Sequence, residues 1–159
     1  MPGTMVGMSE QPEMRPLTDA EQEWVRVRRT FAAQQGVDHL DLNAVETFYD
    51  QLYARAHAEE MDPPELEVLL DVVAVLLGEH LGARHGMQWV AVTDDSDAAG
   101  ETNLALRDTL SSAVVFPQSV VGTEWNHESA AEWIPDYVDW LSAQLQDIRA
   151  EARREERQG

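Results

Sequence analysis

Four acidic residues gather in the short loop DDSDAAGET, which separates two apolar runs. Asp95, Asp97 and Gly100 stand at the first, third and sixth positions of an EF-hand calcium loop. The fifth position is Ala99 and the twelfth is Leu106 in place of the bidentate glutamate, so most of the oxygen ligands are missing. Asp, Ser and Gly are also common turn formers. We therefore favour a turn between two strands over a calcium site.

Other catalytic and metal-binding patterns are incomplete in this chain. His80 and His85 are five residues apart, so on a helix they face different directions and lack the zincin spacing. Cysteine is absent, which excludes disulfides and thiolate zinc ligands. Ser119 has neither flanking glycine of a nucleophile elbow. We expect no catalytic residue, no metal and no cofactor.

Arg107 is the first candidate binding residue. It ends a half-buried strand and points to the opposite side from Leu104 and Leu106. A guanidinium in this position can bind an anion. Alternatively, it pairs with Asp94 or Asp108 and ties the ends of a hairpin together, a contribution of about 0–1 kcal/mol if exposed. We favour the ion pair and keep anion binding as the alternative.

An aromatic strip formed by Trp133, Tyr137 and Trp140 is the second candidate, and the stronger one for a partner. It lies beside the apolar stripe of the last predicted helix, from Ile134 to Ile148. A tryptophan stripe is usually core, but tryptophan is also enriched at interaction hot spots. If the apolar stripe faces the domain's own sheet, the aromatic strip is left for a protein partner or a second copy.

Three helices precede the acidic loop. A capping box, Thr18-Asp-Ala-Glu21, begins the first, which runs to about Gln35 with Trp24, Val27 and Phe31 along one face. A second runs from Asp41 to about Glu60. The third begins at Asp62-Pro-Pro-Glu65, and because it is apolar nearly all round we expect it at the centre of the fold.

Glycines recur every fourth residue at the end of that third helix, at Gly78, Gly82 and Gly86. Glycine weakens a helix, so we expect the close approach of a strand or helix backbone to compensate. Three short strands follow, over residues 87–93, 103–107 and 113–116. Residues 118–125 are ambiguous, although Pro117 favours one or two helical turns. A final helix covers about residues 135–154.

Helices followed by a run of strands indicate an α+β fold. We expect a three-stranded antiparallel meander with N-terminal helices and a long C-terminal helix packed on the sheet. The chain has 159 residues, enough for one domain. We assign residues 1–16 to a disordered arm, 17–150 to a single α+β domain and 151–159 to a frayed charged tail.

The net charge of −19 argues against nucleic acid as a partner, because phosphate binding needs a basic face. No signal peptide and no apolar run of membrane-spanning length is visible, so we expect a soluble cytoplasmic protein that does not bind membranes.

A pattern of short motifs runs through about residues 70–125. It comprises Gly78-x-x-x-Gly82, then Gly86-x-x-Trp89-Val90-x-Val92-x-Asp94, then Leu104-Ala105-Leu106-Arg107, then Val115-Phe116-Pro117-x-Ser119-Val120-x-Gly122. In their order and spacing these motifs resemble the bacterial domain of unknown function 3806. The resemblance implies an α+β domain and supplies no substrate, cofactor or catalytic residue. We favour a non-catalytic protein-binding or adaptor module. The alternative is a small-ligand- or metal-dependent enzyme using Arg107 and nearby acids.

Overall fold

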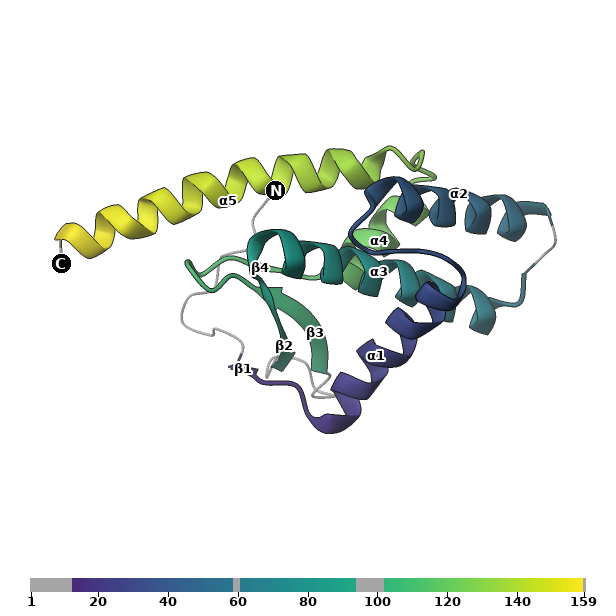
Figure 1. Ribbon diagram of the computed structural model, residues 1–159, viewed down its shortest axis with the longest axis horizontal. Coiled ribbons are helices and arrows are strands. Elements are labelled where there is room, and N and C mark those ends of the chain that lie inside the picture. Colours follow the sequence, from purple (N-terminus) through teal and green to yellow (C-terminus); the bar gives the residue numbers. More distant parts are fainter. Residues whose placement is uncertain (1–12, 59–60, 94–101, 159) are drawn as a thin grey trace.

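The computed structural model describes residues 13–58, 61–93 and 102–158, and within these ranges the chain is an α+β structure (Figure 1). The helices are α1 (Asp19–Gln34), α2 (Leu42–Ala58), α3 (Pro63–His85), α4 (Pro117–Asn126) and α5 (Trp133–Gln158). The strands are β1 (Glu13–Arg15), β2 (Gln88–Thr93), β3 (Thr102–Arg107) and β4 (Val114–Val115). The predicted fold class is confirmed.

Helix α3 is the central element, as its all-round apolar sequence predicts. Pro63 occupies the first turn, and Gly86 ends the helix in the left-handed conformation, with a φ of 73°. Ten residues from Leu69 to Leu81 are buried. The helix contacts all four other helices and strand β2, so little of its circumference beyond the first turns is left to solvent.

The sheet has the antiparallel order β1-β2-β3-β4 and so contains the predicted meander plus one more strand. Trp89 pairs with Leu106, and Leu106 pairs with Val115, so these side chains share the face that joins the core. The additional strand β1 lies within residues 1–16, for which the sequence predicted a disordered arm. It forms because β2 offers an unpaired backbone edge, which β1 covers.

Two of the three regularly spaced glycines make room for neighbouring groups. A Cβ atom at Gly78 would lie 2.3 Å from Trp89 Cζ2, and one at Gly82 would lie 3.2 Å from the carbonyl oxygen of Met87. The Trp89 indole therefore occupies the space above Gly78, where its Nε1 donates a hydrogen bond to Glu79 at 2.9 Å. The close approach that the glycine spacing predicts is present, made by a side chain at Gly78 and by backbone at Gly82.

Helix α1 begins with the predicted capping box, since Thr18 and Glu21 exchange hydrogen bonds. The face that it buries is not the face of Val27 and Phe31. Its buried residues are Val25 and Ala32, whereas Val27 is 47% exposed and Phe31 36% exposed. Helix α1 presents a small side chain, Ala32, and an ion pair, Arg29 with Glu79 at 2.7 Å, to α3. This packing leaves an apolar edge of α1 facing solvent.

The ambiguous segment before α5 is helix α4, which is longer than the one or two turns predicted. Helix α5 is also longer at both ends than predicted and extends beyond the other elements at its C-terminus (Figure 1). Ile134, Val138, Leu141 and Leu145 are buried, and α5 packs mainly against α2 and α3. None of the helices in the described ranges has the length and apolar character needed to cross a bilayer.

Candidate binding surfaces

The structure does not pair Arg107 with Asp108, one of the two acids proposed as its partners. Arg107 is exposed and forms none of the ion pairs found among the described residues. Asp94 lies outside those residues, as does the EF-hand-like loop with Asp95 and Asp97. The expected pairing with Asp108 is wrong. Successive residues of an extended chain point to opposite sides, and Asp108 points into the protein, where it meets Arg149 instead.

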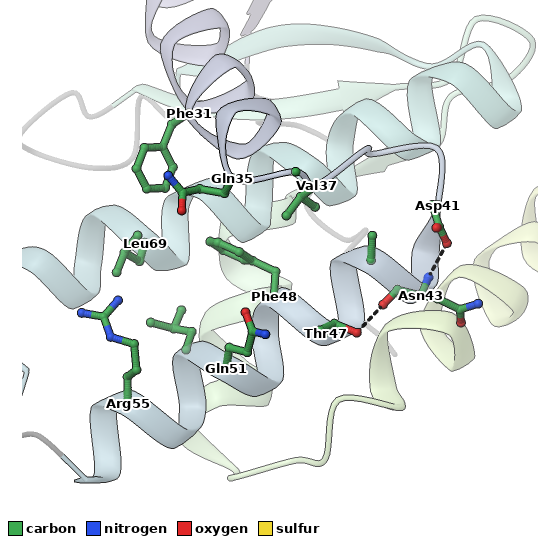
Figure 2. A pocket seen from close by; sticks show the side chains of 13 residues that line it. Phe31, Gln35, Val37, Asp41, Asn43, Thr47, Phe48, Gln51, Arg55 and Leu69 are labelled. Carbon is green, nitrogen blue, oxygen red and sulfur yellow. Dashed lines mark hydrogen bonds between the residues drawn. The ribbon is translucent and has the colours of Figure 1, made fainter.

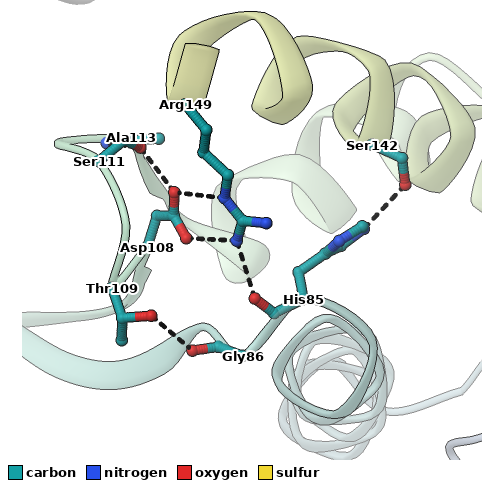
Figure 3. A network of polar contacts seen from close by, with 8 residues as sticks. All are labelled: His85, Gly86, Asp108, Thr109, Ser111, Ala113, Ser142 and Arg149. Carbon is teal, nitrogen blue, oxygen red and sulfur yellow. Dashed lines mark hydrogen bonds and ion pairs between the residues drawn. The ribbon is translucent and has the colours of Figure 1, made fainter. Parts of the chain in front are cut away.

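A polar network around Asp108 joins the end of β3 to α5 and to the end of α3 (Figure 3). The Asp108 side chain has no solvent exposure. It accepts hydrogen bonds from Arg149 Nε at 2.9 Å, Arg149 Nη2 at 2.5 Å and Ser111 Oγ at 2.6 Å. Arg149 Nη2 also donates to the carbonyl oxygen of His85 at 2.8 Å. One guanidinium thus bonds a buried carboxylate and the last turn of α3.

Burial raises the pKa of Asp108, but the hydrogen bonds from Arg149 and Ser111 and the charge of Arg149 outweigh it. The pKa therefore lies below its ordinary value of 3.8. Asp108 is charged at neutral pH, and the network is an ion pair shielded from water. Such a pair holds elements in one arrangement, because leaving either charge buried and unpaired is costly.

His85 and Ser142 form a contact of the kind used in nucleophilic catalysis, with Nε2 and Oγ 2.8 Å apart. The Ser142 hydroxyl lies equally close, at 2.8 Å, to the carbonyl oxygen of Val138, to which it donates. It then accepts from His85 Nε2. Neither of the two surface depressions described below includes this pair. We therefore assign these residues, like the Asp108 network, to holding α5 on α3.

His80 is buried and fixes the connection between α1 and α2. Its Nδ1 donates to the carbonyl oxygen of His39 at 2.8 Å, while Nε2 is buried without a hydrogen-bond partner. Burial lowers the pKa of His80 below 6.5, so the ring is neutral at physiological pH. No three His, Asp, Glu or Cys side chains in the described ranges are grouped so as to hold a metal ion.

The aromatic strip of α5 runs from the core to the surface. Trp133 is buried, and its ring meets Tyr49 edge to face at 5.7 Å between centroids. Tyr137 is half-buried against the core, and this burial raises the pKa of its hydroxyl to about 12. Only Trp140 is well exposed, at 48%, with its ring 6.0 Å from that of Tyr137. The strip therefore presents one ring, that of Trp140, to solvent.

A groove of about 620 Å³ lies between α1 and α2 (Figure 2). We call it the α1–α2 groove. Its residues are Phe31, Gln35, Gly36, Val37, Asp41, Asn43, Ala44, Thr47, Phe48, Gln51, Leu52, Arg55 and Leu69. Figure 2 shows Phe31 on the α1 side and Phe48 on the α2 side, with Leu69 of α3 beside them. Side-chain amides and hydroxyls line its edges, and the charged residues Asp41 and Arg55 lie toward its two ends.

A smaller depression of about 370 Å³ lies between α3 and α4. We call it the α3–α4 pocket. It is lined by Pro63, Leu66, Glu67, Leu70, Asp71, Gln118, Val121, Gly122, Trp125 and Asn126. Sequence reasoning assigned no site to either depression. The spacing of Val27 and Phe31 could have indicated the α1–α2 groove, because it places both apolar side chains on one face of α1. The spacing alone does not say whether that face is buried or exposed.

The comparisons with known proteins identify a family and assign no activity. The model of the family named domain of unknown function (DUF3806) matches residues 49–137, from the middle of α2 to the first turns of α5. The matched segment is wider than residues 70–125, which carry the resemblance in the sequence. Neither the curated proteins nor the solved structures gave a match to this chain. Because the family model covers more than half of the chain, the protein belongs to the DUF3806 family.

Proposed function

We propose that this protein is a protein-binding module and that the α1–α2 groove is its binding surface. The observation that carries the proposal is the apolar edge of α1. Val27 and Phe31 are substantially exposed although their spacing is that of a packed helix face, and Phe31 continues directly into the groove. An exposed apolar patch with a polar rim is typical of a surface that is covered by a partner.

The partner that fits is an amphipathic helix with an apolar face and basic flanks. Phe31, Phe48 and Leu69 offer apolar contacts for side chains spaced three and four residues apart. Gln35 and Gln51 can hydrogen-bond to polar groups at the edge of such a helix. The net charge of −19 attracts a basic partner and repels an acidic one.

The two charges of the groove leave its apolar part free for this contact. Asp41 uses its carboxylate to accept a hydrogen bond from the backbone N–H of Asn43 at 3.0 Å. Arg55 is engaged as well, with Glu65 at 3.5 Å. Because Asp41 and Arg55 lie toward the two ends of the groove, an apolar segment that enters between Phe31 and Phe48 covers neither charge. This is the arrangement that a hydrophobic anchor needs.

Site-specific cross-linking can test the proposal. A photoreactive phenylalanine analogue at Phe31 should cross-link the partner in cells, whereas the same analogue at Thr30, exposed on α1 outside the groove, should not. The purified partner should then bind Phe31→Asp at least about tenfold more weakly than wild type and bind Thr30→Asp normally. Equal cross-linking from both positions, or equal affinity of both variants, would refute the groove as the binding surface.

Exposed Trp140 offers a second possible interface, through which two copies of the chain could form a dimer. The molecular mass in solution distinguishes such a dimer from partner binding in the α1–α2 groove. If the chain forms a dimer through α5, Trp140→Ala should return it to a monomer, and Phe31→Asp should leave the dimer intact. If the α1–α2 groove is the binding surface, Phe31→Asp should lose binding of the partner and Trp140→Ala should keep it.

A further inference from the structure

The α3–α4 pocket combines an apolar interior with negative charge at its rim. Leu66 and Leu70 come from α3, and Val121 and Trp125 come from α4. The Trp125 ring is held in place by edge-to-face contacts with Tyr49, at 5.6 Å, and Tyr53, at 5.4 Å between centroids. These contacts restrict the orientation of the Trp125 ring, which favours binding because less of the protein has to be ordered by a ligand.

Two carboxylates, those of Glu67 and Asp71, line the pocket, and none of its ten lining residues is a cation. Asp71 Oδ1 accepts a hydrogen bond from Gln118 Nε2 at 2.9 Å, which positions the carboxylate. A carboxylate accepts several hydrogen bonds, so Asp71 retains capacity for a further donor. A ligand that covers this pocket therefore meets an aromatic face, aliphatic side chains and uncompensated negative charge.

Gly122 adds open space to the pocket that it lines. It lies inside α4, where glycine weakens the helix relative to alanine. A Cβ atom there would meet nothing within 4 Å, and the backbone does not require a positive φ. Neither a close approach nor an unusual conformation therefore explains the glycine. Its effect is to leave the pocket open beside Trp125.

The geometry points to a binding site for an alkyl cation, in the form of a guanidinium or ammonium group on an aliphatic chain, such as an arginine or lysine side chain. The aliphatic chain would lie along Leu66 and Leu70. The cation would contact the face of Trp125 and bond to Glu67 and Asp71. This site lies on a different face of α3 from the α1–α2 groove, so it does not depend on the proposed function.

Binding can be measured with N-acetylarginine amide and followed through the indole N–H signal of Trp125 in ¹H–¹⁵N spectra. The Trp125→Phe variant identifies that signal among the five tryptophans. The matched control ligand is N-acetylcitrulline amide, which has the same shape without the charge. We expect the arginine compound to shift the Trp125 signal and leave that of Trp140 unchanged. The citrulline compound should bind at least about tenfold more weakly.

Variants of the pocket give the second arm of the test. Glu67→Gln and Asp71→Asn should each weaken binding about three- to tenfold, because each removes a charge and keeps the shape. Gly122→Leu should fill the pocket and abolish binding, whereas Gly122→Ala should retain most of it. Melting curves show that each variant is folded. Equal binding of the arginine and citrulline compounds, or unchanged binding by Gly122→Leu, would overturn the assignment.

The source of the cation is distinguished by a third arm. If agmatine, a free alkyl guanidine, binds as tightly as N-acetylarginine amide, the pocket recognises the cation alone and suits a free small molecule. If arginine within a longer peptide binds more tightly than either compound, the source is a basic protein segment. Both results support the site, and the absence of binding by all three probes overturns it.

Discussion

Replacing Arg149 with methionine should strongly destabilise the protein, although Arg149 lies in the C-terminal half of the last helix, α5. The substitution preserves much of the aliphatic contact and removes the charge. It leaves Asp108, which has no solvent exposure, with only Ser111 and backbone to bond its carboxylate. Removing one partner of a buried ion pair costs about 3–5 kcal/mol in the free energy of unfolding. Urea unfolding followed by circular dichroism would measure this loss as a shift of the midpoint.

The pH dependence of the same variant tests the physical cause. In the wild type, the pKa of Asp108 is lowered, so its contribution is present above 3.8 and is lost as the pH falls through the folded-state pKa. In Arg149→Met, burial remains while the hydrogen bonds and the charge of Arg149 are gone, so the pKa of Asp108 should rise. The difference in stability between the two proteins should then be largest at neutral pH and shrink on acidification, because a protonated Asp108 carries no charge.

A double variant supplies the control for this reasoning. Asp108→Asn combined with Arg149→Met removes the unpaired charge and should unfold at higher urea concentration than Arg149→Met alone. If the double variant is no more stable, the cost comes from lost packing of Arg149 and the ion-pair argument is refuted. A loss below about 1 kcal/mol for Arg149→Met would refute it as well, since exposed ion pairs contribute no more than that.

Three further predictions follow from the packing. Gly78→Ala should lower the free energy of unfolding by about 1–3 kcal/mol, because its Cβ would overlap the Trp89 ring, and a thermal melt of Gly78→Ala/Trp89→Leu should show partial recovery. The pKa of His80 is lowered by burial, so wild-type stability should fall as the pH drops below 6.5, and chemical unfolding of His80→Asn should show a weaker fall over that range. Trp133→Ala should cost about 3–5 kcal/mol and Trp140→Ala less than about 1 kcal/mol by urea unfolding, since only Trp133 is buried. Equal losses for the two tryptophan variants would contradict the assignment of Trp133 to the core.

The helices and the sheet could be predicted where local chemistry determines them. The capping box at Thr18, the prolines that begin α3 and α4, and Gly86 in the left-handed conformation each act through a few neighbouring residues. Helix α3 is apolar on nearly all sides, and a helix of this kind is stable only in the interior of the fold. Strand β1 could not be predicted in this way, because three residues pair only when an edge of β2 is available beside them.

Which face of α1 is buried could not be predicted, because the choice depends on a residue fifty positions away. Glu79 of α3 accepts from both Arg29 and the Trp89 indole, and this shared carboxylate fixes α1 against α3 with Ala32 at the contact. Turning α1 to bury Val27 and Phe31 would separate Arg29 from Glu79 and leave that partly buried carboxylate with one partner fewer.

The same packing explains why candidate sites found by residue type differ from those found by shape. Arg107 and the strip from Trp133 to Trp140 were selected because such side chains bind ligands often, but spacing along a chain does not say which groups lie together. Asp108 shows the consequence, since its partner is Arg149 in α5 and not its neighbour Arg107. The α1–α2 groove exists because α1 packs through Val25, Ala32 and the Arg29–Glu79 ion pair, which leaves Phe31 outside the core. The contacts that hold α1 on α3 also leave the apolar edge of α1 exposed. A partner could therefore cover Val27 and Phe31 without rearranging the core.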